Sequence, residues 1–116
     1  MTGLTIIVAT ADAERFRTAL TMALTQAALG GRTRLFLQDG AVALLRGDDA
    51  DQVRSAGLPD RAFMLADALD AGVEMIGCQT GLALINAAAD EFDARIGWAG
   101  MVSLLQTLDQ DRLVVV

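Results

Sequence analysis

The chain has 116 residues and a hydrophobic content of 53%, which is enough for one packed core and too high for a disordered chain. Its net charge of −6 disfavours nucleic-acid binding, because an acidic surface repels phosphates and the nine basic residues are scattered. One Cys with no His, Lys or Tyr excludes a Ser-His-Asp triad, a Cys-His pair and a Lys Schiff base within one chain. A zinc site is not expected either, and we expect neither a metal nor a cofactor.

The location expected from the sequence is the cytoplasm. The first apolar run, Leu4 to Ala9, is too short for a signal peptide, and acidic residues follow it. No apolar run reaches the roughly 18 residues of a membrane span. A single cysteine cannot form an internal disulfide. We therefore expect no contact with a membrane.

The N-terminal third predicts a strand, a helix and a second strand. Leu4 to Ala9 is β-branched and apolar, as in a buried parallel strand. Asp12 is a predicted N-cap. The helix after it has apolar residues at helical spacing, namely Phe16, Ala19, Leu20, Ala23, Leu24, Ala27 and Ala28. Gly30 and Gly31 should end this helix, and Thr33 to Gln38 is the second predicted strand.

The middle of the chain is more polar. Gln38-Asp39-Gly40 predicts a turn, and Ala41 to Arg46 predicts a short helix, with a strand as the alternative. Residues 47–60 contain the only proline and predict a loop that could hold one helical turn. Within this loop, residues 48–51 form an acidic cluster that we interpret as solvated.

Further elements are predicted in the second half: helix 61–71, strand 73–77, helix 80–89, strand 94–97, helix 98–109 and strand 112–116. In helix 61–71 the candidates for burial are Phe63, Met64, Ala68 and Leu69, and Gly72 should cap this helix. In the last helix they are Met101, Leu104, Leu105 and Leu108. The closing Val triplet suits a buried strand. Strands alternating with helices predict a single domain over residues 1–116, a three-layer α/β/α fold with a parallel sheet of four to five strands.

Cys78 is the leading candidate for a functional residue. It follows an apolar strand and precedes a predicted helix, where unpaired N–H groups favour thiolate over thiol. The alternative is a buried cysteine that only packs, and position alone does not separate the two. In an open parallel sheet, ligands bind beyond the carboxyl ends of the strands, and Cys78 lies at such an end. This placement favours a functional role.

Other residues near the same edge are candidates for contacting a substrate: Thr10, Asp39, Gln79, Thr80, Gly97 and Trp98. Asp39 could accept a proton or orient a substrate, although a turn residue is the favoured interpretation. A nearby carboxylate would raise the pKa of the thiol. Thr80 could hydrogen-bond a sulfur anion, but an N-cap role is the simpler reading. Trp98 could form a wall of the site, but a core or subunit contact is favoured.

Four stretches in this order resemble the DsrE/DsrF-like family of small sulfur-relay proteins. They are Leu4 to Thr10 with the helix after it, Arg34 to Leu45, Gly72 to Gln79, and Gly97 to Val116. The resemblance implies an α/β/α fold, homo-oligomers such as trimers or hexamers, and carriage of a persulfide on Cys78. The run that follows the cysteine, residues 80–84, departs from the family's Met-Ser-Met-like run. This departure predicts a different environment for the sulfur acceptor.

Three functions remain as hypotheses. The first is a sulfurtransferase or persulfide carrier that exchanges sulfur with a donor or acceptor protein through Cys78. The second is a non-catalytic oligomeric module that binds a small anion or nucleotide at the same edge. The third is a redox thiol, which is weaker because no Arg lies beside Cys78 in the sequence. In each case we expect a homo-oligomer, because the predicted helix 80–89 lacks a clear polar face.

Overall fold

The computed structural model describes the backbone of residues 1–47 and 51–116, and the side chains of residues 1–47 and 53–116. In this part of the chain, parallel strands form a five-stranded sheet in the order β4-β3-β2-β1-β5. The strands are β1 (Leu4–Val8), β2 (Thr33–Leu37), β3 (Glu74–Cys78), β4 (Gly97–Ala99) and β5 (Arg112–Val115). The sheet and its flanking helices confirm the predicted three-layer α/β/α fold class.

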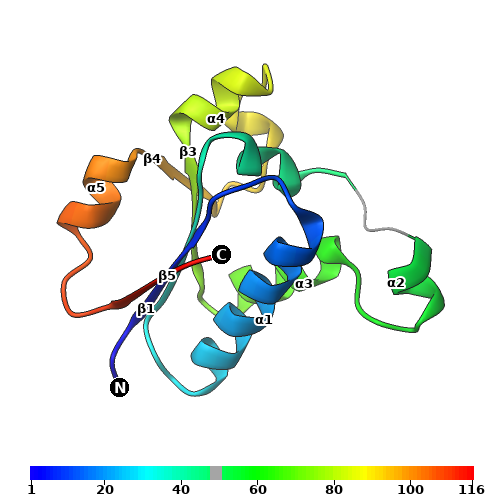
Figure 1. Ribbon diagram of the computed structural model, residues 1–116, viewed down its shortest axis with the longest axis horizontal. Coiled ribbons are helices and arrows are strands. Elements are labelled where there is room, and N and C mark those ends of the chain that lie inside the picture. Colours follow the sequence, from blue (N-terminus) through cyan, green and yellow to red (C-terminus); the bar gives the residue numbers. More distant parts are fainter. Residues whose placement is uncertain (48–50) are drawn as a thin grey trace.

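Helices cover both faces of this sheet. They are α1 (Ala13–Ala28), the 3-10 helix η1 (Asp39–Leu45), α2 (Asp51–Ser55), α3 (Arg61–Asp70), α4 (Gln79–Leu84), the 3-10 helix η2 (Ala89–Glu91) and α5 (Met101–Gln106). Figure 1 shows α1 and α3 on one face and α5 on the other, with α4 beyond the ends of the strands. The edge predicted to carry the site is therefore covered by short helical segments.

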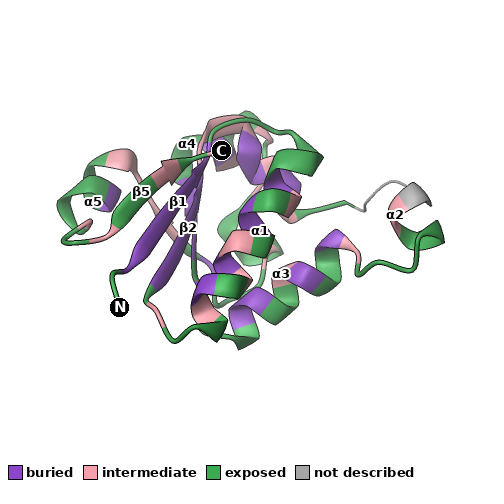
Figure 2. Ribbon diagram, turned by 60° about the horizontal axis from the view of Figure 1, so that its bottom comes forward, coloured by how far each residue is buried: buried purple, intermediate pink, exposed green. Residues whose placement is uncertain are grey.

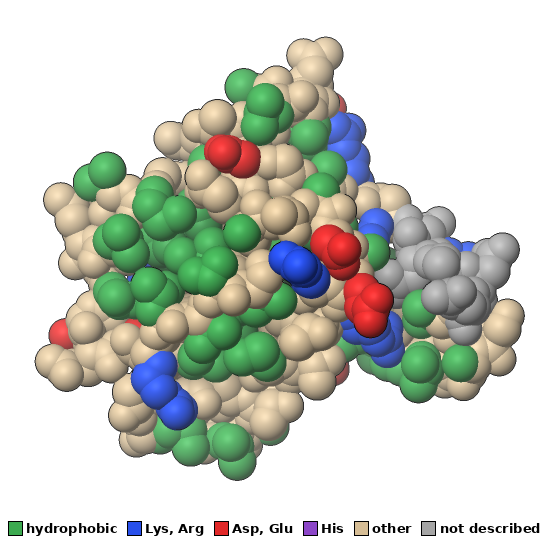
Figure 3. All heavy atoms as spheres, in the orientation of Figure 1, with side chains coloured by type: hydrophobic (Ala, Val, Ile, Leu, Met, Phe, Trp, Pro, Cys, Tyr) green, Lys and Arg blue, Asp and Glu red, His purple; other side chains and the backbone are tan. Residues whose placement is uncertain are grey.

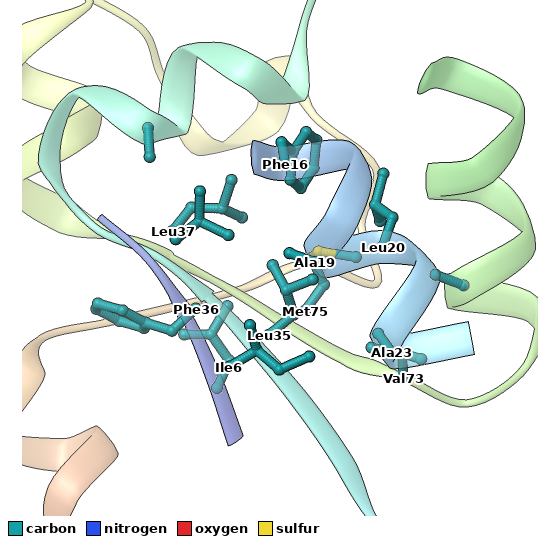
Figure 4. Close-up of a cluster of buried hydrophobic side chains, with 14 of the residues drawn as sticks. Ile6, Phe16, Ala19, Leu20, Ala23, Leu35, Phe36, Leu37, Val73 and Met75 are labelled. Carbon is teal, nitrogen blue, oxygen red and sulfur yellow. The ribbon is translucent and has the colours of Figure 1, made fainter. Parts of the chain in front are cut away.

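The main core lies between α1 and the central strands. Ile6, Leu35 and Met75 lie side by side in register across β1, β2 and β3. Phe16 and Leu20 of α1 pack over them, and both side chains are fully buried (Figure 4). Strands β1 and β2 are buried along their whole length, as Figure 2 shows. This burial on both faces explains the nearly continuous apolar sequence of β1 and of residues 35–37 in β2.

The long helices end in Schellman motifs, in which a residue with positive φ turns the chain. Gly30 (φ 85°) and Gly72 (φ 88°) hold this position after α1 and α3, as predicted. Asn86 (φ 52°) holds it after α4, where the N–H of Ala87 donates to the carbonyl of Leu82. The predicted helix 80–89 was therefore wrong in length. It stops at Leu84, because an asparagine accepts the left-handed conformation nearly as well as glycine does.

The structure also corrects the C-terminal predictions. Strand β4 covers residues 97–99 instead of 94–97, so Trp98 pairs with Gly77 of β3 and does not belong to a helix. Helix α5 is correspondingly shorter than the predicted 98–109. Strand β5 lies at the edge of the sheet, and the side chain of Val115 is 64% exposed. The Val triplet is therefore not buried within this chain.

Corrections in the middle of the chain are smaller. Residues 39–45 are helical, in agreement with the favoured interpretation, but form a 3-10 helix. Helix α2 supplies the single helical turn in the predicted loop. Phe63 was wrongly placed inward, since its side chain is 63% exposed while Met64, Ala68 and Leu69 are buried. Most of the acidic cluster, residues 48–50, lies outside the described residues.

A buried polar network beneath α5 was not predicted from the sequence. The Arg34 guanidinium donates to the hydroxyls of Thr5 (3.0 Å) and Thr107 (2.7 Å) and lies 3.6 Å from the Asp111 carboxylate. The side chains of Arg34 and Asp111 are only 3% and 4% exposed. The network ties β1 and β2 to both ends of the α5–β5 connection. Among the described residues, no helix is long and apolar enough to cross a membrane.

Candidate functional site around Cys78

Cys78 occupies the junction that the sequence predicted. It is the last residue of β3 and the N-cap residue of α4, with extended backbone angles (φ −74°, ψ 130°). Strand β3 is interior, because β2 and β4 flank it. Cys78 is 5% exposed, so its sulfur lies just beneath the surface at the carboxyl edge of the sheet.

Hydrogen-bond donors from two segments surround the Cys78 sulfur. Burial raises the pKa of the thiol, but the backbone N–H groups of Asp39, Gly81 and Thr80 lower it, as does the Thr80 hydroxyl. The net result is a Cys78 pKa below the ordinary value. Donors that point at a sulfur stabilise the thiolate, which is the nucleophilic form. The local backbone therefore favours a reactive cysteine over an inert one.

Asp39 lies beside this sulfur and contributes two opposing groups. Its backbone N–H lowers the pKa of the Cys78 thiol, while its carboxylate oxygen Oδ1 lies 3.8 Å from the sulfur and can accept the thiol proton. The backbone of Asp39 is left-handed (φ 45°), a conformation that Asp accepts more readily than most residues. Asp39 is thus the first residue of η1 and not a simple turn residue, and its carboxylate contacts the Cys78 thiol.

Gly81 is a site residue that the sequence reasoning missed. A Cβ at this position would overlap the Val42 side chain and the carbonyl oxygen of Asp39. The absence of a side chain therefore lets α4 pack directly on η1, which brings the Gly81 and Asp39 amides to the same sulfur. The only signal in the sequence was a glycine inside a predicted helix, which often marks a close approach of two backbones.

The other predicted residues divide into two groups. Gln79 and Thr80 begin α4 next to Cys78, and Thr80 contributes to the site without being the N-cap, because Cys78 holds that position. Thr10 follows the end of β1 and is exposed. No contact of Thr10 or Gln79 with the sulfur is seen among the described residues.

Gly97 and Trp98 are not brought to the sulfur. Gly97 begins β4 and pairs with Ile76, so it lies toward the middle of β3 and not at the carboxyl edge. Trp98 pairs with Gly77, and its ring covers the position where a Cβ of Gly77 would lie. Because successive side chains alternate along a strand, Trp98 and Cys78 lie on opposite faces of the sheet. Trp98 instead packs against Phe92, with ring centroids 5.4 Å apart.

A separate cleft of about 500 Å³ opens between η1, α3 and η2. Apolar side chains such as Leu65, Phe92 and Ile96 form much of its lining. It lies at the C-terminal end of η1, whereas Asp39 and Cys78 meet at the N-terminal end. We therefore place the candidate chemistry at Cys78, where donors converge on a nucleophile, and not in this cleft.

Comparison with known proteins agrees with this architecture. No curated protein matches the chain. Among solved structures, the crystal structure of the YchN protein from E. coli aligns over 100% of both chains, with a TM-score of 0.76 and 19% sequence identity, which shows a shared fold. The family model described as the DsrE/DsrF-like family matches residues 3–116. The chain therefore belongs to the DsrE/DsrF-like family, which is associated in general with sulfur relay.

Proposed function

We propose that this protein carries sulfane sulfur as a persulfide on Cys78 and passes it to a thiol of a partner protein. The observation that carries the proposal is the place of Cys78 at the N-terminus of α4 beside η1, where three nearby backbone N–H groups and the Thr80 hydroxyl lower the pKa of its thiol. Membership of a family associated in general with sulfur relay supports sulfur transfer as the chemistry of this thiolate. Neither an anion-binding module nor a redox thiol has this combined support.

The proposed reaction needs only thiol–sulfur exchange. The Cys78 thiolate attacks the outer sulfur of a donor persulfide, R–S–SH, and forms a new S–S bond. The S–S bond of the donor breaks and its electron pair leaves with R–S⁻, so Cys78 becomes Cys78–S–SH. A thiolate of the acceptor protein then attacks the outer sulfur and restores the Cys78 thiolate. Oxidation states balance without an added oxidant. A lowered pKa raises the fraction of Cys78 present as thiolate and makes Cys78 a better leaving group in the second step.

We further propose that the relay operates in the cytoplasm and that the protein is a homo-oligomer, a trimer or a hexamer. The donor and the acceptor would each dock at the carboxyl edge of the sheet, where Cys78 lies just beneath the surface. The role of partner thiols follows from the chain itself, because one cysteine cannot resolve a persulfide internally as a disulfide.

Intact mass spectrometry tests this function directly. Purified protein is incubated with polysulfide, or with thiosulfate and a rhodanese, and we expect a gain of about 32 Da, one sulfur atom, per chain. The Cys78→Ser variant is the control, because it lacks any thiol and should stay at its unmodified mass. Addition of a thiol acceptor should return the loaded wild-type protein to its original mass.

A packing role for Cys78 makes a different set of predictions. A purely structural thiol should be alkylated only after denaturation, and Cys78→Ser should then cost on the order of 1–3 kcal/mol, because an unpaired hydroxyl would be buried. Wild-type protein that stays unmodified under donors that load a known persulfide carrier would reject the proposal. Sulfur loading together with an unchanged melting temperature of Cys78→Ser, measured at a pH below the Cys78 pKa, would support it.

A further inference from the structure

The Asp39 carboxylate places a negative charge next to the sulfur that its own backbone N–H stabilises. Oδ1 lies 3.8 Å from Cys78 Sγ. The backbone fixes this arrangement, since Asp39 begins η1 and its carbonyl oxygen packs tightly on Gly81 of α4. A carboxylate is not needed to hold the turn, because asparagine accepts the same left-handed conformation. The backbone conformation therefore does not account for the negative charge at position 39, and we look for its role in the reactions of Cys78.

No basic side chain on the packed elements neutralises this charge. The segments beside the Cys78 sulfur are η1, α4 and β4, and Asp39 carries the only ionisable side chain on these three. Arg34 of β2 and Glu74 of β3 are in register near the amino ends of their strands, away from Cys78. Arg46 follows η1, but its guanidinium donates to the carbonyl of Ile85 (2.8 Å), which is the C-cap of α4. That contact holds the Arg46 charge at the end of α4 opposite to Cys78. Any molecule that approaches the sulfur therefore experiences the Asp39 charge.

The short distance between Asp39 Oδ1 and Cys78 Sγ brings every reacting atom close to the carboxylate charge, whatever its direction of approach. A sulfur atom that bonds to Sγ ends about 2.05 Å from it. Because Oδ1 is 3.8 Å from Sγ, the incoming sulfur atom must come within about 6 Å of the carboxylate. At that separation two unit charges still repel appreciably at the surface of a protein. A negatively charged reactant is consequently disfavoured relative to an uncharged one of similar size.

We propose that Asp39 is a selectivity residue, whose carboxylate disfavours anionic sulfur donors, such as thiosulfate and polysulfide anions, in their reaction with Cys78. For thiosulfate the disfavoured step is attack of the Cys78 thiolate on the outer sulfur. It forms Cys78–S–S⁻ and releases sulfite with the electron pair of the broken S–S bond. The part of this inference that concerns sulfur donors rests on the proposed function. The effect of the Asp39 charge, in contrast, applies to any reagent that reacts with Sγ.

A pair of alkylating reagents isolates the charge effect. Iodoacetate and iodoacetamide both react with the thiolate, so the ratio of their rates does not depend on the thiolate fraction and reports only the charge of the reagent. In wild-type protein we expect the iodoacetate-to-iodoacetamide ratio to be lower than for the same cysteine in urea-unfolded protein. The Asp39→Asn variant should raise the native ratio by at least about 3-fold. Added salt should raise the ratio in the wild-type protein more than in the variant.

Asp109→Asn is the matched control. Asp109 is also left-handed (φ 54°) and exposed, and it lies in the α5–β5 connection, which precedes the amino end of β5 and is away from Cys78. This variant removes one negative charge from the same kind of backbone position and should leave the ratio unchanged. Thermal unfolding of all three proteins shows whether the fold is kept. An equal ratio in wild-type and Asp39→Asn proteins that are both folded would overturn the proposal.

Sulfur loading separates this inference from the proposed function. If Cys78 carries sulfur, Asp39→Asn should gain one sulfur from thiosulfate or polysulfide faster than wild type does, again by about 3-fold or more. A changed alkylation ratio with no loading of either protein by any donor would reject persulfide carriage and keep the charge effect. Normal loading at equal rates with an unchanged ratio would reject the role of Asp39 and keep persulfide carriage.

Discussion

Cys78 illustrates how backbone groups can tune a thiol without any basic side chain. Its hydrogen-bond donors come from the start of η1 and the start of α4, two segments about 40 residues apart in the chain. Because these donors are amides and one hydroxyl, they are present at every pH. The pH dependence of the charge on the sulfur therefore comes from the titration of the thiol itself.

The lowered pKa of Cys78 predicts a specific dependence of reactivity on pH. The rate of alkylation by iodoacetamide should reach half its maximum at a lower pH in the native protein than in protein unfolded in urea. Rates measured across pH 6–10 on both samples check this, with the unfolded chain as the internal reference. An equal or higher midpoint in the native protein would contradict the effect of the amides.

The same pKa shift links stability to pH. Because the folded pKa is lower than the unfolded one, thiolate stabilisation is fully present above the unfolded pKa, about 8.5, and is lost as pH falls through the folded pKa. The difference in unfolding free energy between wild type and Cys78→Ser should therefore increase as pH rises across this window. Urea titrations at several pH values measure this difference, and the Ser variant, which has no titrating thiol, corrects for all other groups.

At the scale of elements, the contact between η1 and α4 builds the site. Gly81→Ala should push α4 away from η1, because the new methyl group would overlap Val42 and the Asp39 carbonyl. We expect a loss of about 1–3 kcal/mol in unfolding free energy. We also expect a higher Cys78 pKa, because the backbone amides of η1 and α4 would lie farther from the sulfur. Denaturant titration and the pH profile of alkylation measure the two effects.

Gly40→Ala is the matched control for this prediction. Gly40 belongs to η1, the other side of this contact, but no atom outside its neighbouring backbone lies within 4 Å of the position of its Cβ. Its substitution should leave both the unfolding free energy and the Cys78 pKa nearly unchanged. A Gly81→Ala variant that behaves like Gly40→Ala would show that α4 does not depend on this close contact.

The connection between α5 and β5 depends on the buried network around Arg34. Arg34→Leu would leave the Asp111 carboxylate buried with fewer partners, and the expected loss of unfolding free energy is about 3 kcal/mol. In contrast, Arg95→Leu removes exposed ion pairs with Asp70 and Asp93 and should change stability much less. Urea titrations of both variants test the contrast. Equal losses would mean that burial of the Arg34 network does not determine its importance.

At the scale of the whole molecule, the face that carries α5 and β5 is notably apolar. Figure 3 shows hydrophobic side chains gathered over these elements. The exposed members on α5 and β5 are Val102, Leu105, Leu113 and Val115. Contiguous exposed apolar groups of this kind favour association with another protein surface. The expected oligomer should therefore bury this face, and the original argument from a helix over residues 80–89 no longer holds.

This expectation can be checked by a charge substitution. The double variant Leu105→Glu with Val115→Glu should shift the protein toward monomers, because carboxylates would be buried in the interface. Light scattering at micromolar concentration measures the mass of the assembly. Leu58→Glu, at an exposed apolar residue elsewhere, is the control and should leave the assembly intact. A monomeric wild-type protein would reject the expected oligomer.

The sequence by itself determined the class of fold. Hydrophobic periodicity located most of the strands and helices, because burial of one helix face or of a whole parallel strand leaves a local pattern. Helix ends at Asp12, Gly30 and Gly72 were also predictable, since capping depends on residues adjacent in the chain. The position of Cys78 between β3 and α4 followed from the same local signals.

Only the tertiary structure decided what surrounds Cys78. Strand order brings β2 next to β3, so that Asp39 lies beside a cysteine 39 positions later, and no local pattern encodes this contact. Trp98 was misplaced because strand pairing with Gly77 overrode a sequence that also suits a helix. Gly81 was missed because its role is a close approach between two backbones. Such contacts depend on packing between segments distant in sequence. The hydrophobic pattern predicts which residues are buried but not which segment they pack against.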